Sequence, residues 1–326
     1  MKASKKKTQI FTAPKSLRIK DFIRENGMLF VLMLLMLFMA ILSPKFLSIH
    51  NLVNLAIQNC TVAIVALGIS YVLISGGIDL SMGSVVGLTA ILTCGLTQFD
   101  HLPEWLAILI SLVLSISVGL LNGWIITRFK LEPVVVTLGT WYLVQGLVQN
   151  YILSRVPTAP PITTFLGSGL LFGFPVIVII TLLMILITHL VLTRTVLGRW
   201  AYAMGGNPVA ARLSGVPVNK ARIIFFALSA FYAFVSALLM TGRIHAVDAN
   251  AGTGIVFLAP AAAVVGGTSL FGGRGSAFNA VIGALMMGVI ANGLNLTKVS
   301  FFWQQVAVGA AILIAVSIDA IQRRRD

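Results

Sequence analysis

The sequence predicts an all-α integral membrane protein with about ten transmembrane helices. Of its 326 residues, 58% are apolar and only 10% are charged, whereas soluble domains average about 45–50% apolar and about 25% charged residues. Apolar runs long enough for a membrane-spanning helix recur along the whole chain. The longest polar stretches, residues 1–26 and 194–220, are too short for a soluble domain. Chemistry that needs such a domain must therefore come from another chain.

Ten apolar segments, bounded by polar residues, glycine or proline, are the predicted spans. In chain order they cover residues 27–43, 52–75, 84–99, 105–127, 133–153, 170–193, 221–242, 256–270, 276–296 and 303–321. A spanning helix needs about 20 mainly apolar residues, which most of these segments provide. Segments 84–99 and 256–270 are short and rich in Gly and Ala. We expect these two to be re-entrant or broken helices packed inside the bundle.

The first span follows a basic stretch and is expected to remain in the mature protein. No small-residue cleavage site follows it, because Ile41-Leu42-Ser43-Pro44 leads directly into the next loop. We therefore expect three regions: a cytoplasmic basic tail at 1–26, a single transmembrane domain at 27–321, and a second cytoplasmic tail at 322–326.

The placement of Lys and Arg orients the predicted spans. Short cytoplasmic loops have an excess of basic residues. With the N-terminus inside, the predicted inner segments hold 19 Lys and Arg, and the outer loops hold four. Ten spans with both termini cytoplasmic fit this distribution best. The net charge of +14 then reflects topology and attraction to anionic membrane lipid. Nucleic acid is not an expected partner, since no folded basic domain is present.

Cysteine and histidine give no sign of a metal centre. Cys60 and Cys94 lie in apolar surroundings without a CxxC or Cys/His spacing, so we expect buried free thiols. The four histidines are scattered and never pair at a ligand spacing. We expect no metal site and no disulfide framework.

The longest inner loop contains a predicted short helix outside the membrane. Asn207 is a good N-cap, Pro208 suits the first helical position, and Gly215 stops the helix. Val209 and Leu213, four residues apart, give this helix an apolar face. It is either an interfacial helix against the bilayer or, as we favour, a docking element for a cytoplasmic partner. The docking element comprises Gly205, Gly206, Asn207, Pro208, Ala210, Ala211, Arg212, Leu213, Ser214 and Gly215.

Two glycine-rich stretches are candidates for gates or helix caps. Gly76-Gly77 can end one helix in a left-handed conformation, and Asp79 or Ser81 can cap the next. The alternative for Asp79, the one acidic residue expected inside the membrane profile, is a gate or a contact that transmits movement. Residues 252–293 contain 10 of the 30 glycines, which must pack helices closely or line a cavity. The candidates there are Gly266, Gly267, Gly272 and Gly273.

The second glycine-rich stretch is not a phosphate-binding loop. Gly272-Gly273-Arg274-Gly275 lacks the Gly-Lys-Ser/Thr of a Walker A motif, which occurs nowhere in the chain. The chain therefore cannot hydrolyse ATP by itself. The Gly83-x-x-x-Gly87 and Gly119-x-x-x-Gly123 patterns instead predict faces for close helix packing.

Amide side chains inside the spans either line a path for solute or join helices by hydrogen bonds. The sequence leaves these two alternatives open. The path candidates are Gln58, Asn59, Gln145, Asn292 and Asn295.

Three motifs in register give the chain a family resemblance. Residues 205–215, running into a span that begins at Arg222, resemble the coupling loop of permeases in the ribose and branched-chain amino acid class of ABC importers. Residues 75–84 are similar to that family's stretch between its second and third spans, and residues 263–276 to its C-terminal glycine-rich stretch. The resemblance covers essentially residues 40–320.

The resemblance implies a transport subunit in the bacterial inner membrane, without enzymatic activity or a cofactor of its own. In this family two permease chains pair, as a homodimer or as a heterodimer of related chains. Two cytoplasmic ATPase subunits, which bind ATP and Mg²⁺, dock on the coupling helix. An extracytoplasmic sugar-binding protein delivers the solute to the outer loops.

The C-terminal part of the resemblance bears on the substrate. Phe302-Trp303-Gln304-Gln305 is similar to ribose-type members, but Val256 and Leu258 stand where those members usually have two acidic residues. Pro260 is a further difference, of a kind found in other branches, including autoinducer-2-type permeases. We expect a monosaccharide or a related polyol, with autoinducer-2 or another small solute as the alternative. An ion-coupled secondary carrier is less favoured, because Asp79 alone is thin support for a proton relay.

Overall fold

Helices dominate the computed structural model, which describes residues 27–152, 156–248 and 250–323. The predicted tail 1–26 and residues 324–326 of the C-terminal tail lie outside the described residues. In chain order the elements are α2 (Gly27–Leu42), α3 (Ile49–Ile74), α4 (Met82–Gln98), α5 (Glu104–Phe129), α6 (Pro133–Ile152), α7 (Pro161–Ser168), β1 (Leu170–Leu171), β2 (Phe174–Pro175), α8 (Val176–Arg194), α9 (Val196–Gly206), α10 (Pro208–Leu213), α11 (Val218–Ile244), α12 (Ile255–Val265), α13 (Ala277–Leu296) and α14 (Phe301–Arg323).

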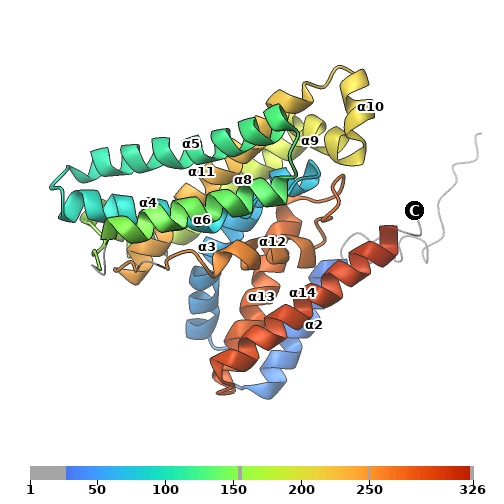
Figure 1. Ribbon diagram of the computed structural model, residues 1–326. Coiled ribbons are helices and arrows are strands. Elements are labelled where there is room, and N and C mark those ends of the chain that lie inside the picture. The colour runs from blue at the N-terminus through green and yellow to red at the C-terminus, as the bar shows by residue number, and fades with distance from the viewer. Residues whose placement is uncertain (1–26, 153–155, 249, 324–326) are drawn as a thin grey trace, which may run out of the picture.

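Two groups of long helices surround α3 (Figure 1). Helices α4, α5, α6, α8 and α11 run roughly alongside one another, whereas α2, α13 and α14 form a second group. Helix α11 packs against α5, α3, α7 and α4, and α3 also contacts α13, α12 and α8. The most hydrophobic window of α3 is 83% buried. Helix α3 therefore contacts both groups, and a displacement of α3 would change the packing of both.

Five of the described helices are long and apolar enough to cross a membrane: α3, α5, α8, α11 and α13. Shorter apolar helices are Gly27–Leu42, Met82–Gln98, Ile255–Val265 and the Phe302–Ile314 part of α14. Helix α6 coincides with the predicted span 133–153 but is more polar than the five. The all-α membrane class predicted from composition is therefore correct, while the number of ten spans stays a prediction.

Helix α12 is the shortest of the predicted spans. It has 11 residues with Pro260 inside it, so at 1.5 Å per residue it is only about 16 Å long. The hydrocarbon core is about 30 Å thick. The expectation of a short helix packed inside the bundle is therefore met at 256–270, whereas α4, with 17 residues, is closer to full length.

One predicted boundary is wrong. Residues 170–175, expected to begin the span 170–193, form the hairpin β1–β2, and α8 starts only at Val176. Phe172 and Gly173 both have positive φ, at 51° and 82°, which is the conformation of a two-residue hairpin turn. The apolar composition of the hairpin hides it within the apolar run of α8. Helices α7 and α9 were likewise not predicted.

The predicted glycine faces do pack closely. A Cβ added to Gly119 or Gly123 of α5 would lie 2.4 Å from Phe226 O or 2.6 Å from Ile223 Cα of α11. A Cβ on Gly87 of α4 would lie 2.6 Å from Ala251 O. Because no side chain fits there, the backbones approach one another directly, and van der Waals packing holds the helices together.

Candidate functional site

Helix α10 has the caps that its sequence predicts. The side-chain oxygen of Asn207 accepts hydrogen bonds from the backbone N–H of Val209 at 2.9 Å and of Ala210 at 3.0 Å. At the other end Gly215 has a φ of +85°, and its N–H donates to Arg212 O at 3.0 Å. These bonds satisfy the free backbone groups at both ends, so a helix of only six residues is well defined.

The surface of α10 is apolar and exposed. Leu213 is 86% exposed and Val209 is 68% exposed, while Ala211 is buried beneath them. Figure 1 shows α10 at one corner of the molecule, beyond the ends of the long helices. Large exposed apolar side chains in a polar loop mark a site of interaction. The geometry suits the docking element predicted from the sequence.

Helix α9 joins α8 to α10 and is fixed to the second glycine-rich stretch. Its N-cap, Thr195, follows α8 directly, and Ala201 and Met204 are buried. The hydroxyl of Tyr202 donates to Gly275 O at 2.8 Å. Burial raises the pKa of Tyr202, so this hydroxyl stays protonated and remains a donor. Helices α9 and α10 therefore cannot move without acting on the stretch around Gly275.

Three distant segments meet backbone to backbone at Gly76, Gly205, Gly272 and Gly273, which we call the glycine junction. Gly273 N donates to Ile74 O, the last residue of α3, at 2.9 Å. A Cβ added to Gly205 would lie 1.9 Å from Ile74 O and 2.3 Å from Gly273 N. The end of α9 thus fills the space between the end of α3 and the second glycine-rich stretch.

The other members of the glycine junction are equally restricted. Gly272 and Gly273 have φ values of +90° and +78°, and Gly76 has +82°, a region that residues with a side chain rarely adopt. A Cβ on Gly272 would lie 2.9 Å from Gly205 Cα and 3.0 Å from Gly76 Cα. By contrast, a Cβ on Gly206 would have nothing within 4 Å. The sequence marked all five glycines, but only the structure separates Gly206 from the rest.

The glycine pairs Gly76-Gly77 and Gly266-Gly267 end their helices in the same way. Gly76 N donates to Leu73 O and Gly77 N to Val72 O, each at 2.9 Å. At the end of α12, Gly267 has a φ of +105° and its N–H donates to Val264 O. This is the Schellman arrangement. The left-handed cap predicted for the first pair is present, and Gly266 also packs against the backbone of α13.

Asp79 is buried in the link between α3 and α4 and joins two elements. One carboxylate oxygen accepts from Ser81 N at 3.0 Å and from Ser81 Oγ at 2.6 Å, and the other accepts from Ser229 Oγ of α11 at 2.6 Å. Ser81 is the N-cap residue of α4 but makes no cap bond with its side chain. The contact with α11 favours the second alternative, a residue that links moving parts.

The hydrogen bonds continue from Ser81 across two more helices. Asn122 Nδ2 of α5 donates to Ser81 Oγ at 2.9 Å, and Thr140 Oγ1 of α6 donates to Asn122 Oδ1 at 2.6 Å. Asp79, Ser81, Asn122, Thr140 and Ser229 form a continuous network, which we call the polar chain. No local signal in the sequence connects Asn122 with Asp79.

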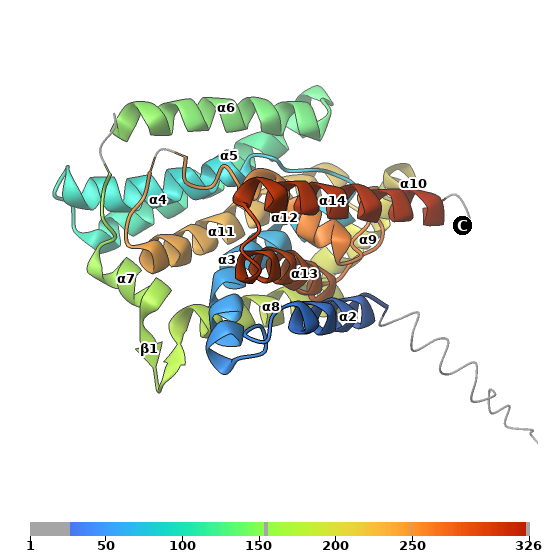
Figure 2. The same ribbon diagram turned by 90° about the horizontal axis from the view of Figure 1, so that it is seen from below.

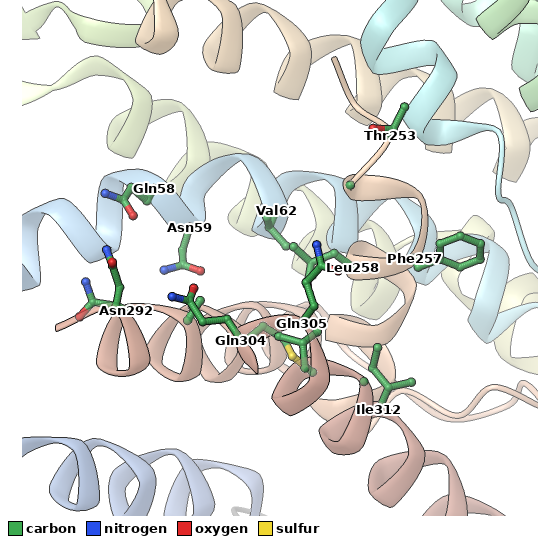
Figure 3. Close-up of a pocket in the computed structure, with 17 residues that line it drawn as sticks. Gln58, Asn59, Val62, Thr253, Phe257, Leu258, Asn292, Gln304, Gln305 and Ile312 are labelled. Carbon is green, nitrogen blue, oxygen red and sulfur yellow. The ribbon is translucent and has the colours of Figure 1, made fainter. Parts of the chain in front are cut away.

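A pocket of about 690 Å³ lies between α3, α12, α13 and α14. It contains four of the five predicted path residues, Gln58, Asn59, Asn292 and Asn295. Gln145 is not among its lining residues; it lies on α6, close to Gly87, so its role in a path stays a prediction. Figure 3 shows Gln58, Asn59 and Asn292 toward one side of the pocket and Phe257 and Ile312 toward the other, with Gln304 and Gln305 between them. None of the described lining residues is charged.

The amides of the pocket fall into two kinds. Asn292 exchanges two hydrogen bonds with Asn51 of α3, at 2.9 and 3.0 Å, and Asn59 donates to Leu55 O at 2.7 Å. Asn292 therefore joins α13 to α3, whereas Asn59 bonds within its own helix. Gln58 and Asn295 are exposed, and their side chains make no hydrogen bond within the described ranges, so they are available to a solute.

The pocket also includes two residues that the sequence analysis did not select. Gln304 and Gln305, near the start of α14, line it together with Asn295. Gln304 Nε2 donates to Val299 O at 2.9 Å, while Gln305 is exposed. The signal was present, because both residues belong to the Phe302–Gln305 motif that carried the family resemblance.

No cluster of three or more metal-binding side chains exists within residues 27–152, 156–248 and 250–323. Cys60 and Cys94 are free and buried, as expected.

Known proteins agree with these features. Residues 51–316 match the family described as the branched-chain amino acid transport system permease component. The ribose import permease protein RbsC of Haemophilus influenzae is 34% identical over 312 residues, which are 93% of this chain and 95% of that protein. RbsC of Bacillus subtilis is 34% identical over 96% of this chain and 98% of its own length. The D-allose transport system permease protein AlsC of Escherichia coli is 33% identical over 90% of this chain and 91% of its own length.

No solved structure matches the chain significantly. The family match covers most of the sequence, and the relatives align over nearly their full lengths. The family's permease components are transport subunits of the membrane, which agrees with the apolar helices of this fold. The chain belongs to the family of branched-chain amino acid transport system permease components.

Proposed function

We propose that this chain is the transmembrane permease of an ATP-driven, binding-protein-dependent importer. Its proposed solute is a monosaccharide, either a ribose-like sugar or a related polyol. Similar proteins are described as ribose and D-allose permeases, and the pocket has neutral hydrogen-bonding amides that suit hydroxyl groups. A volume of about 690 Å³ lies in the range of small-molecule sites. Autoinducer-2 or another small neutral solute would fit the same lining.

The proposed topology is ten spans with both termini in the cytoplasm of a bacterial inner membrane, because this arrangement fits the basic residues best. Two such chains pair, as homodimer or heterodimer. Cytoplasmic ATPase subunits, which bind ATP and Mg²⁺, dock on residues 205–215. An extracytoplasmic sugar-binding protein contacts the outer loops around 44–51, 98–104, 154–169 and 243–255.

The glycine junction is the observation that supports this mechanism most directly. It joins α9, and through it the exposed helix α10, to the end of α3 and to the stretch between α12 and α13. The elements that it touches, α3, α12 and α13, are the same ones that line the pocket, together with α14. A push on α10 by a closing ATPase therefore reaches the walls of the pocket through rigid helices and backbone contacts.

The decisive experiment is uptake of radiolabelled pentoses and hexoses by proteoliposomes. With the ATPase and the binding protein present, we expect ATP-dependent uptake. The chain alone, given a proton or sodium gradient, should take up nothing. Sustained gradient-driven uptake by the chain alone would instead support the secondary carrier.

The docking surface is tested in the same assay. Leu213→Asp places a charge on an apolar surface that is 86% exposed, so folding should be unaffected while ATPase binding and uptake are lost. Thermal unfolding of the purified chain checks the first expectation, and co-purification of the ATPase checks the second. An unchanged amount of bound ATPase would refute α10 as the docking site.

A further inference from the structure

The hairpin β1–β2 is a rigid apolar arm that stands out from the helices. Leu170 pairs with Pro175 and Leu171 with Phe174, and Val176 N donates to Gly169 O at 3.0 Å, which closes the base of the arm. Figure 2 shows it, labelled at β1, projecting beyond α7 and away from the long helices. It lies at the start of α8, so it is at the opposite end of that helix from α9 and α10.

The residues of the arm suit water poorly. Phe172 is 93% exposed, Phe174 is 69% exposed and Leu170 is 62% exposed. Phe172 also has a positive φ of 51°, a conformation that is rare for a bulky residue and that Asn, Asp or Gly normally occupies in this turn. A turn of this type that is exposed to water normally has Asn, Asp or Gly at this position. A phenylalanine at this position indicates a selective reason to present an aromatic ring at the tip.

The arm continues an apolar surface of a helix that can cross the membrane. Residues 156–193 contain no Asp, Glu, Lys or Arg. Along α8, Leu182, Leu186 and Leu190 are all exposed and lie on one face at intervals of four residues. In a membrane protein such a face contacts lipid. The hairpin extends it at the end of α8 without an intervening charged residue.

The base of the arm is held firmly. The carboxylate of Glu104, in the first turn of α5, accepts from Ile162 N at 2.8 Å and from Thr163 N at 2.6 Å at the start of α7. At the other end of α7, a Cβ on Gly167 would lie 2.3 Å from the backbone of Gly242 in α11. The arm therefore has a fixed position relative to α5 and α11, and its tip is held at one depth.

We propose that the hairpin is a membrane anchor whose Phe172 and Phe174 rings insert into the lipid bilayer at its boundary with water, on the face opposite α10. Phe and Leu side chains of segments that lie at the membrane surface bury into the boundary between headgroups and acyl chains. At that boundary the free backbone groups at the edges of the hairpin still reach water, which they could not do in the hydrocarbon core. The occupant of the apolar surface is lipid, because the surface is continuous with that of α8 and lacks charge. The anchor goes beyond the proposed transport function and does not depend on the substrate.

The test is site-directed spin labelling of the full chain in phospholipid vesicles. Phe172→Cys and Phe174→Cys are labelled, with Leu186→Cys as the lipid reference and Val209→Cys as the aqueous reference. The chain without an added cysteine measures background from Cys60 and Cys94, which are buried. Accessibility to oxygen, which concentrates in lipid, is compared with accessibility to a water-soluble nickel chelate.

We expect the ratio of oxygen to nickel accessibility at positions 172 and 174 to lie between those at 186 and 209 and to exceed that at 209 several-fold. A ratio equal to that at 209 would overturn the anchor and place the hairpin in water. Low accessibility to both reagents would also overturn it, since another protein surface would then cover the hairpin. Because no transport is measured, this result is independent of the importer assay.

Discussion

The glycine junction and the amide-lined pocket are both contacts of α3, but they are built in opposite ways. At the junction, three backbones meet with no side chain between them, and a Cβ on Gly205 would lie 1.9 Å from Ile74 O. In the pocket, Gln58 and Asn295 extend freely into about 690 Å³ of space. Close packing transmits displacement, while loosely held amides bind solute weakly. We therefore expect the end of α3 at the junction to transmit movement and the part of α3 in the pocket to bind solute weakly.

Gly205→Ala should reduce uptake and stability more than the variants that follow. A small effect would contradict the close packing at the glycine junction. The added Cβ meets backbone atoms rather than a flexible side chain, and overpacking costs about 1–3 kcal/mol. We expect ATP-driven uptake to be lost and thermal unfolding to occur at a lower temperature. Both are measured on the importer in vesicles and on the purified chain.

Gly206→Ala is the matched control for that variant. The neighbouring glycine lies in the same last turn of α9, but an added Cβ has nothing within 4 Å. Because Gly206 belongs to the residues proposed to dock the ATPase, thermal stability is the quantity compared, and it should stay close to that of the unchanged protein. Equal losses in the two variants would mean that helix geometry, and not the close backbone contact, is what matters at residue 205.

Substitution of Asp79 should have the next largest effect, because the polar chain is a second connection between α11 and the end of α3. Asp79→Ala leaves three buried donors of Ser81 and Ser229 without their acceptor, at a cost of about 3 kcal/mol. Asp79→Asn keeps one oxygen acceptor, so its loss should be smaller. Thermal unfolding and uptake measure both variants.

The control for Asp79 is Ser117→Ala, since among the described residues the side chain of Ser117 bonds to Val113 O of its own helix and to no other group. It should change stability by well under 1 kcal/mol. If Asp79→Ala destabilised the chain no more than this control, the polar chain would be unimportant for holding the elements together.

Local sequence signals predicted the caps of α10 and marked the glycines of the junction, but not how the three segments of the junction meet. Asn207, Pro208 and Gly215 act within one helix, and their roles follow from backbone hydrogen bonding alone. That Gly205 lies against Gly272 depends on how α9, α3 and the second glycine-rich stretch pack, and no local pattern encodes this. The glycine content indicated close packing without naming the partners.

The sequence predicted the pocket less well than the junction. The local sequence around an amide in a span does not tell whether the amide lines the pocket, as Gln58 does, or lies elsewhere in the bundle, as Gln145 does. The hairpin was missed for a related reason: Leu170 to Phe174 is as apolar as α8, and a short apolar run does not distinguish strand from helix. Tertiary contacts decided both cases.

The double variant Gln58→Ala with Asn295→Ala tests whether the loosely held amides of the pocket bind solute. Neither side chain makes a hydrogen bond within the described part of the chain, so stability should be unchanged. Loss of two neutral hydrogen bonds to solute, each worth about 0.5–1.5 kcal/mol, should lower uptake severalfold. The ATPase rate should not change, because the junction is intact.

Gln149→Ala is the control for this double variant. Gln149 is an exposed amide of α6 that does not line the pocket. Its uptake should equal that of the unchanged protein. If the control and the double variant lowered uptake equally, the loss would not be specific to the pocket.

The smallest effect is expected at Asn292, which both lines the pocket and joins two helices. This residue lines the pocket, yet its amide exchanges two hydrogen bonds with Asn51, so it should behave as a structural residue. In membrane proteins such interhelical bonds average only about 0.6 kcal/mol in double-mutant cycles. Asn51→Ala, Asn292→Ala and the double variant, measured by thermal unfolding, should give a coupling free energy of about that size.

Asn51 lies outside the pocket lining, so Asn51→Ala should lower uptake no more than its stability loss explains. A large drop in uptake for Asn292→Ala alone, with no coupling to Asn51, would instead make Asn292 a solute contact like Gln58 and Asn295.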